Sequence, residues 1–158
     1  MTIREDVHIH AEAPIVHRRL MDLGSLSEWL PERFRHVRAE GERCSFTLAL
    51  PLRAESAQLH VAIAEEPYTL TLATDNSARN MPPASSTDSN IPAIQLLRWE
   101  LQPEGRGEVH VTVAAVYRPP RGIAGPLLDL LMFRPCRRQA LRDALWKLKH
   151  LIEASPSM

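Results

Sequence analysis

The chain has 158 residues, of which 44% are hydrophobic and 24% are charged, and its formal net charge is zero. This length suits a single domain that buries roughly two thirds of the surface of its unfolded chain, and the composition excludes a disordered or fibrous protein. The first residues lack the apolar stretch of a secretory signal, and no apolar run approaches the ~20 residues that cross a bilayer, so we expect a cytoplasmic protein without a transmembrane segment.

The N-terminal part predicts a strand followed by two short helices. Apolar residues alternate with polar ones over residues 7–11, as in a strand with one buried face. Pro14 fits the first turn of a helix, with Gly24 as its C-terminal cap. Ser25 and Glu28 have the spacing of a capping box, which predicts that a second helix begins there.

The middle of the chain predicts a succession of antiparallel strands. Alternating apolar side chains, separated by turn residues, place strands over residues 34–40, 44–50, 58–63, 68–74, 97–102 and 109–117. The segment over residues 75–92 is rich in Pro, Ser and Asn, which is typical of a long loop that is either disordered or a lid over a site. We expect this loop and the loop over residues 118–126 to flank the entrance of any pocket.

The C-terminal part predicts one helical pattern of about 27 residues after a loop rich in Pro and Gly. Pro135 removes one backbone hydrogen bond and should kink or split this helix near residues 133–136. The helix should bury a single apolar stripe against the sheet. That stripe consists of Leu127, Leu128, Leu131, Met132, Leu141, Leu145, Leu148 and Ile152.

Taken in order, these elements predict an α+β fold with the sequence βααββββββα. Because consecutive strands usually pair, the simplest arrangement is a seven-stranded curved antiparallel sheet around the long C-terminal helix. We expect one domain over residues 1–153 and a short C-terminal tail over residues 154–158.

Three short segments add to this element order: Ala13-Pro14, Trp29-Leu30-Pro31, and LWKLKHLIE at residues 145–153. With these features the chain resembles the SRPBCC superfamily, the START-like and Bet v 1-like helix-grip domains that include polyketide cyclases and coenzyme Q-binding proteins. The resemblance implies a largely apolar pocket for a lipid, polyketide, quinone or similar hydrophobic small molecule. It implies no catalytic residues, because the superfamily shares an architecture rather than a catalytic signature.

The larger apolar residues of the strands, together with three residues of the helix, define the wall of this expected cavity. We predict that the ligand-binding residues are Phe46, Leu48, Val61, Tyr68, Leu70, Leu72, Leu97, Trp99, Val111, Val113, Tyr117, Leu128, Leu131 and Met132. The alternative is a solid core, which the same residues would also form. Buried Tyr and Trp side chains favour a pocket, because their polar atoms need a partner that a ligand or water can supply.

An enzyme of the polyketide cyclase, aromatase or dehydratase type, acting in the same cavity, is a second possible function. A carbonyl of its substrate would be polarised by one of four residues: Tyr68, Tyr117, Arg53 or Arg98. Arg98 is disfavoured because it alternates with Trp99, so the two side chains cannot both face inward. No Asp or Glu falls on a predicted inward strand position, which argues against general acid–base chemistry.

A protein-interaction module is a third possible function, because the C-terminal helix is basic. Residues 118–150 contain eight Lys or Arg and two Asp, whereas residues 1–117 contain eleven basic and sixteen acidic residues. The interacting face would consist of Arg134, Arg137, Arg138 and Arg142. A single basic stripe does not predict a nucleic-acid partner, and the oligomeric state stays open.

Seven histidines raise the question of a metal site. His8 and His10 share one face of the first strand, and if that strand pairs with the last one, His110 lies on the same outer face. The alternation that buries Val7 and Val109 directs these histidines into solvent. We therefore expect them to be surface residues, and we predict neither a metal site nor a cofactor.

Overall fold

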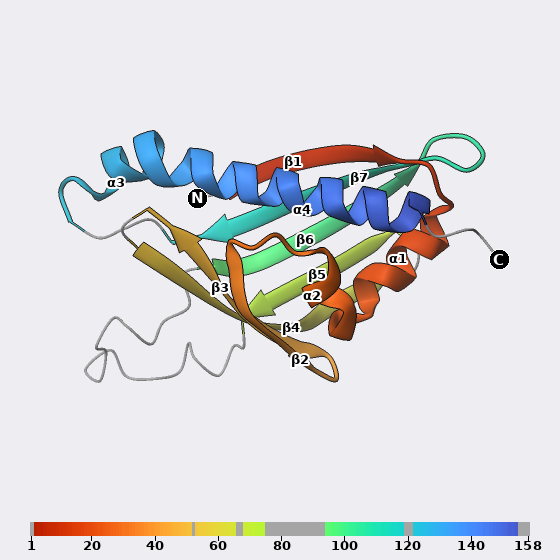
Figure 1. Cartoon of the computed structure of the whole chain (residues 1–158), viewed down its shortest axis with the longest axis horizontal. Helices are drawn as coiled ribbons and strands as arrows, with labels where there is room; N and C mark the ends of the chain where they lie inside the picture. The colour runs from red at the N-terminus through yellow and green to blue at the C-terminus, as the bar shows by residue number, and fades with distance from the viewer. Residues whose placement is uncertain (1, 52, 66–67, 75–93, 119–121, 155–158) are drawn as a thin grey trace.

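The computed structural model describes residues 2–51, 53–65, 68–74, 94–118 and 122–154. Within them, seven strands form one curved sheet in the order β1-β7-β6-β5-β4-β3-β2, and successive neighbours in this order are antiparallel (Figure 1). The strands are β1 (Thr2–Ile9), β2 (Phe34–Glu40), β3 (Arg43–Leu50), β4 (Arg53–Glu65), β5 (Thr69–Thr74), β6 (Ile94–Pro103) and β7 (Val109–Tyr117). The predicted topology is confirmed.

The first strand shows why these segments form a sheet. Its residues alternate between exposed and buried from Thr2 to Ile9, with Ile3 and Val7 packed inside. Successive side chains of a strand point to opposite faces, so one face of each strand can be apolar while the other meets water. β1 is longer than predicted because the alternation continues toward the N-terminus through residues 2–6.

Two helices connect β1 to β2, and their ends differ from the prediction. Helix α1 (Ala13–Met21) ends three residues before Gly24, where the backbone N–H of Asp22 donates to the carbonyl of Arg18. A 3₁₀ turn, Leu23–Ser25, then leads into α2 (Leu26–Trp29). The capping box is wrong, because Ser25 already has helical backbone angles and its hydroxyl donates to the carbonyl of Asp22 at 2.8 Å.

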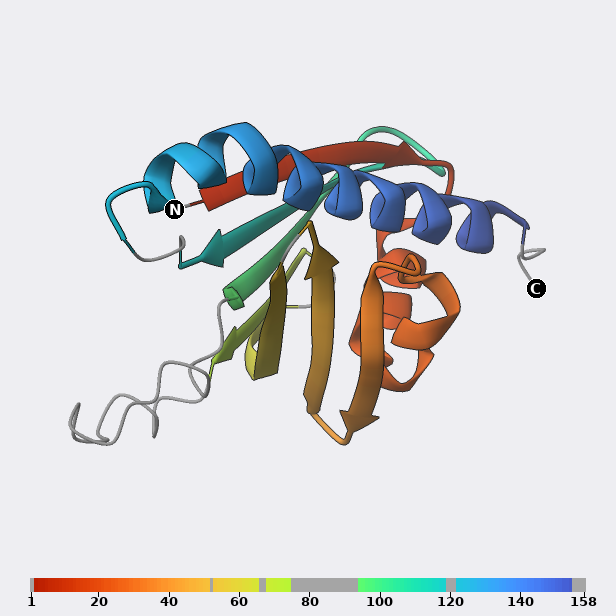
Figure 2. The ribbon, with the colours of Figure 1, turned by 60° about the vertical axis from the view of Figure 1, so that its left-hand side comes forward.

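The C-terminal helix is interrupted at the predicted place. A short α3 (Gly125–Leu128) leads through a π-helical turn, Asp129–Phe133, into α4 (Arg134–Ala154). In an unbroken α-helix the ring of Pro135 would clash with the carbonyl of Leu131, and a wider turn at this point gives the ring room. α4 lies across the concave side of the sheet (Figure 2). None of the helices in the described ranges is long and apolar enough to cross a membrane.

The predicted apolar stripe of this helix is correct only in its C-terminal half. Its buried members are Leu141, Leu145, Leu148 and Ile152. Its exposed members are Leu127, Leu128 and Leu131. The buried line continues from Leu141 toward the N-terminus in steps of four residues, through Arg137, Phe133 and Asp129. Because side chains four residues apart share a helix face, the leucines before Phe133 lie off this line.

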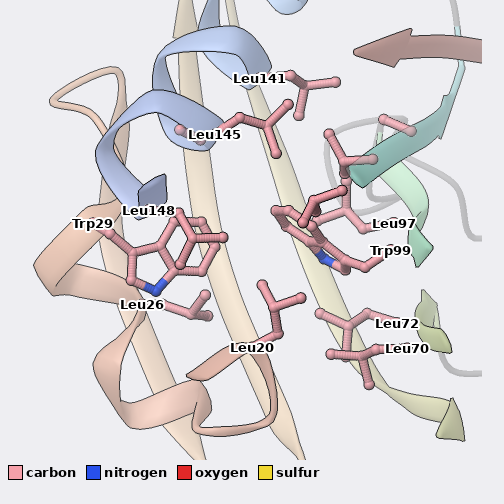
Figure 3. Close-up of a cluster of buried hydrophobic side chains, with 14 of the residues drawn as sticks. Leu20, Leu26, Trp29, Leu70, Leu72, Leu97, Trp99, Leu141, Leu145 and Leu148 are labelled. Atoms are coloured by element: carbon pink, nitrogen blue, oxygen red, sulfur yellow. The ribbon is translucent and has the colours of Figure 1, made fainter. Parts of the chain in front are cut away.

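The C-terminal half of α4 covers a tightly packed core (Figure 3). Leu145 and Leu148 face the sheet there, and side chains from α1 and α2 fill the space beside them. The rings of Trp29 and Trp99 meet edge to face with centroids 5.7 Å apart, a favourable arrangement for aromatic rings. In this half of the interior, the solid core that the sequence left as an alternative is the observed state.

Candidate functional site

A small apolar cavity lies beneath the N-terminal half of α4, beyond the packed core. Its volume is about 20 Å³, enough for about one water molecule. Its wall comes from β1, β2, β3, β6, β7 and α4, and the lining residues are Ile3, Phe34, Phe46, Leu48, Ile94, Leu97, Ala115, Tyr117, Arg137 and Leu141. The surface that faces the cavity is apolar, and Tyr117 and Arg137 are the two lining residues that carry polar groups.

Arg137 is the centre of a buried polar cluster at this cavity. Its side chain is almost fully buried, and its Nε donates to Oε1 of Glu55 at 2.6 Å while Nη2 donates to the other oxygen of the same carboxylate. The third guanidinium nitrogen, Nη1, donates to Oδ1 of Asp129. The bidentate contact between this guanidinium and the Glu55 carboxylate fixes the orientation of both groups.

Tyr117 and Arg53 complete the cluster. The hydroxyl of Tyr117 donates to Oδ2 of Asp129 at 2.8 Å, and the guanidinium carbon of Arg137 lies 3.8 Å from the centre of the Tyr117 ring. Nη2 of Arg53 lies 3.2 Å from Oε2 of Glu55. Two positive and two negative side chains thus balance one another, which reduces the cost of removing four charges from water.

The surroundings set the protonation of the two groups that line the cavity. Burial alone would lower the pKa of Arg137, but its hydrogen bonds to Glu55 and Asp129 raise that pKa above its ordinary value, so the guanidinium stays charged. Burial and the hydrogen bond to Asp129 raise the pKa of Tyr117 to about 12. At neutral pH the cavity is therefore bordered by one cation and one neutral phenol.

The pKa of Tyr117 leads to a testable prediction. Tyr68→Phe leaves Tyr117 as the single tyrosine, and we expect its ultraviolet titration in the folded protein to centre near pH 12 instead of about 10. Because the folded state favours the neutral phenol, this contribution to stability is complete below about pH 10 and is lost as the pH rises toward about 12. Adding Asp129→Asn should lower the midpoint, and a midpoint near 10 in the folded Y68F protein would contradict the assignment.

The sequence analysis missed the acidic members of this cluster. It predicted no inward Asp or Glu on a strand, and this prediction is wrong, because Glu5 and Glu55 are both buried. The predicted strand begins at residue 58 and so leaves out Glu55, whereas β4 begins at Arg53. The sequence does contain this signal. Residues an even number of positions apart in a strand share a face, so extending the predicted strand back from Leu59 to Glu55 puts Glu55 on the buried face.

Nine of the predicted ligand-binding residues are buried as expected: Phe46, Leu48, Leu70, Leu72, Leu97, Trp99, Val111, Val113 and Tyr117. Val61 and Met132 are half-buried. Four of these residues line the cavity, namely Phe46, Leu48, Leu97 and Tyr117. Trp99, by contrast, packs against Trp29 in the filled half of the core. None of this tests ligand contact, so the binding role of these residues stays a prediction.

The predicted inward orientation of Tyr68, Leu128 and Leu131 is wrong, because all three side chains are exposed. Tyr68 precedes the first residue of β5 and so lies outside the alternation that buries Leu70. The two leucines belong to α3 and the π-helical turn, off the buried line of the helix. Arg98, in contrast, faces outward as expected and pairs with Glu100 at 3.0 Å.

An exposed apolar patch surrounds α3 and the π-helical turn, at the end of the molecule that holds the polar cluster. Its members are Ile123, Leu127, Leu128, Leu130 and Leu131. The predicted entrance loop over residues 75–92 lies outside the described residues, as do residues 119–121 of the second predicted entrance loop. In the described part of the chain, this apolar segment is the surface element next to the cluster, because Asp129 belongs to it.

The basic face of α4 differs from the prediction in one member. Arg137 is buried, so the outward residues are Arg134, Arg138 and Arg142. Arg138 and Arg142 both contact Oε1 of Glu5, at 2.9 Å and 3.3 Å. The basic face that the interaction hypothesis requires therefore has three arginines instead of four, and Glu5 neutralises part of its charge.

The fold is shared with several solved structures. TTHA0849 from Thermus thermophilus is 18% identical, with a TM-score of 0.74 over 99% of this chain and 100% of that one. A START superfamily protein from Mycobacterium smegmatis is 12% identical, with a TM-score of 0.67 over 97% of both chains. Zhui aromatase/cyclase from a Streptomyces species is 10% identical, with a TM-score of 0.69 over 97% of this chain and 93% of that one. No protein-family model and no curated protein sequence matches the chain.

Proposed function

Because the chain has the helix-grip fold of the SRPBCC superfamily, we propose that it binds a hydrophobic small molecule between its curved sheet and α4. One observation carries the proposal: an apolar cavity on the concave side of the sheet is bordered by the side chains of Tyr117 and Arg137. A cavity with a few convergent polar groups is the usual form of a small-molecule site.

The polar cluster would orient the ligand. Arg137 has five N–H donors, and the hydrogen bonds described above engage three of them with Glu55 and Asp129. A ligand carbonyl or hydroxyl at the cavity edge would accept from this guanidinium or exchange a hydrogen bond with Tyr117. Affinity would come from apolar burial, at roughly 25 cal/mol per Å² before ordering costs.

Binding requires the interior to open. The observed cavity of about 20 Å³ is far below the ~300 Å³ at which small-molecule pockets begin. We expect the segment from Gly125 to Phe133 to move, because its leucines are exposed and a π-helical turn often marks a functional irregularity in a helix. Its outward shift would enlarge the cavity beside Tyr117 without disturbing the core around Trp29.

Filling the cavity should block the site. Ala115 is buried on the inner face of β7 and lines the cavity, so Ala115→Leu places three extra carbon atoms in the space the ligand would use. We expect at least about tenfold weaker binding of the neutral dye N-phenylnaphthylamine, a loss of about 1.4 kcal/mol. Fluorescence titration of the dye measures the change, and far-ultraviolet circular dichroism checks the fold.

The neighbouring residue supplies the matched control. Ala114→Leu adds the same atoms on the opposite face of β7, where the strand partners of Ala114 are Arg4 and Arg98. This variant should bind the dye as the parent protein does. Equal dissociation constants for the A115L and A114L proteins would remove the cavity from the binding site.

Catalysis of the polyketide cyclase, aromatase or dehydratase type is the second candidate, and the buried carboxylates favour it. Asp129 accepts the single proton of the Tyr117 hydroxyl at 2.8 Å and so orients the phenol beside the cavity. In that case the Tyr117 hydroxyl would turn from Asp129 to donate to a substrate carbonyl, and Arg137 would stabilise the charge that develops on the carbonyl oxygen. Tyr117→Phe would then abolish turnover while dye binding persists.

A further inference from the structure

We propose that His8, His110 and Glu104 bind a divalent transition-metal ion such as Zn²⁺ on the outer face of the sheet. This inference is independent of the cavity and of the function proposed for it. His8 and His110 are directly opposite each other in the β1–β7 ladder, and Glu104 lies in the turn between β6 and β7, next to the end of β1 (Figure 1). One donor atom from each of the three residues lies within 4.8 Å of the other two.

The donor atoms of the three residues lie close together. Nε2 of His8 lies 3.1 Å from Nδ1 of His110, and Nδ1 of His110 lies 3.6 Å from Oε1 of Glu104. In a tetrahedral zinc site with bonds of about 2.0–2.1 Å, neighbouring donor atoms are about 3.3 Å apart. The two distances lie on either side of this value, so these two pairs of donor atoms have nearly the spacing that a metal ion requires.

The carboxylates around the two rings determine which nitrogens carry protons. The Asp6 carboxylate lies 2.8 Å from Nε2 of His110, and Oε2 of Glu104 lies 3.3 Å from Nδ1 of His8. A carboxylate only accepts, so a neutral ring that donates to one of these carboxylates carries its N–H on the nitrogen nearest to it. The remaining nitrogens lie 3.1 Å apart, with the two rings edge to face, and Oε1 of Glu104 lies 3.6 Å from Nδ1 of His110. Three electron-rich donor atoms gathered in this way favour a cation among them.

Asp6 strengthens this assignment because it occupies the position of a supporting residue. Metal-binding histidines commonly donate their other N–H to a carboxylate, which fixes the tautomer and the direction of the ring. The Asp6 carboxylate lies 2.8 Å from Nε2 of His110, the ring nitrogen that would face away from the metal when Nδ1 binds it. Two imidazoles and one carboxylate form a donor set suited to Zn²⁺, with the remaining positions open to water. The sequence analysis found the histidines but did not place Glu104 or Asp6 beside them.

The exposure of the residues is compatible with metal entry. The side chains of His8 and Glu104 are about half exposed, and His110 is partly covered. A hydrogen bond between the two rings would also hold them together without a metal ion. Titration with Zn²⁺ distinguishes the two states, because only a metal site takes up the ion in a fixed ratio.

The test is calorimetric titration of the full chain, without an affinity tag, with Zn²⁺ in a buffer that does not bind metals. We expect saturation at one Zn²⁺ per chain. His8→Ala and His110→Ala should each weaken binding at least about tenfold, and Asp6→Asn should weaken it about tenfold although Asp6 does not touch the metal. Co²⁺ added in place of Zn²⁺ should give the visible absorption of a tetrahedral ion, and this signal should disappear in the His8→Ala variant.

His10 provides the matched control. It lies just after the end of β1, two residues from His8, and its Nδ1 pairs with Oε1 of Glu108 at 3.1 Å; it is not part of the triad. His10→Ala should leave Zn²⁺ binding unchanged. Absence of saturable binding would overturn the proposal in favour of a protonated histidine pair, and so would binding that the His8→Ala and His110→Ala variants retain. Circular dichroism of each variant checks that the fold is intact, and His8→Gln replaces His8→Ala if the latter is unfolded.

Discussion

Replacing Arg137 with methionine should lower the free energy of unfolding by about 3–5 kcal/mol, because the change leaves two buried carboxylates without their cation. Glu55 and Asp129 are both about 1% exposed and both accept hydrogen bonds from this guanidinium. Methionine matches much of the volume of the arginine stem, so the loss reports charge and hydrogen bonding more than packing. Urea unfolding followed by tryptophan fluorescence gives the value.

The control for this prediction is the next residue of the same helix. Arg138→Met removes an exposed guanidinium that contacts Glu5, and such a pair contributes about 1 kcal/mol or less. Combining Arg137→Met with Glu55→Gln and Asp129→Asn should restore part of the loss, because it removes the uncompensated charges. Similar losses in the R137M and R138M proteins would show that the cluster is not buried as described.

The second large effect concerns the orientation of the C-terminal helix. Leu148 lies on the buried side of α4, is 0% exposed, and packs among Trp29, Leu145 and other core residues. Leu148→Ala should therefore lower the free energy of unfolding by about 2–5 kcal/mol through lost contacts and a new cavity. Leu131 was assigned to the same stripe by the sequence pattern but is 66% exposed. Leu131→Ala should therefore change stability by no more than about 0.5 kcal/mol.

The effects of these two substitutions distinguish the predicted helix, which has one continuous buried stripe, from the observed helix. A single continuous stripe would make both substitutions costly. If unfolding in urea shows equal losses for L148A and L131A, the helix is continuous and the exposed apolar patch does not exist. A large difference supports the observed helix, in which the buried line runs through Arg137, Phe133 and Asp129 and leaves Leu131 exposed.

Much of the fold could be predicted from alternation alone. The bounds of β2 and β7 agree with the prediction, and the sheet order follows from pairing of successive strands together with the pairing of β1 and β7. The break at Pro135 was also predictable, because a ring without an N–H cannot continue a helix undisturbed. These features depend on local chemistry, which the sequence displays directly.

The candidate site was harder to predict because its chemistry departs from the hydrophobic pattern. Arg137 and Asp129 occupy positions of the buried helix line where an apolar residue is expected, and Glu55 occupies such a position on β4. Each is tolerated inside only because the others neutralise it, and this pairing joins residues up to 82 positions apart. A single sequence gives no signal for such a long-range pairing.

The ends of the short helices differ from the prediction for another reason. Ser25 and Gly24 have the right residue types for caps, but the chain between α1 and α2 forms a 3₁₀ turn that uses the Ser25 hydroxyl for a contact to Asp22. Local hydrogen bonds of this kind compete with the helix cap for the same side chain. Packing of Leu23 and Leu26 into the core decides between them.

The most direct test of ligand binding beneath α4 is to locate the bound dye by nuclear magnetic resonance. Intermolecular nuclear Overhauser effects between N-phenylnaphthylamine and methyl groups of the protein report which side chains it touches. We predict contacts to Ala115, Leu97 and Leu141, which line the cavity. Contacts confined to Leu127, Leu130 and Leu131 on the exposed patch would contradict the account, because the dye would then bind the surface and leave the interior closed.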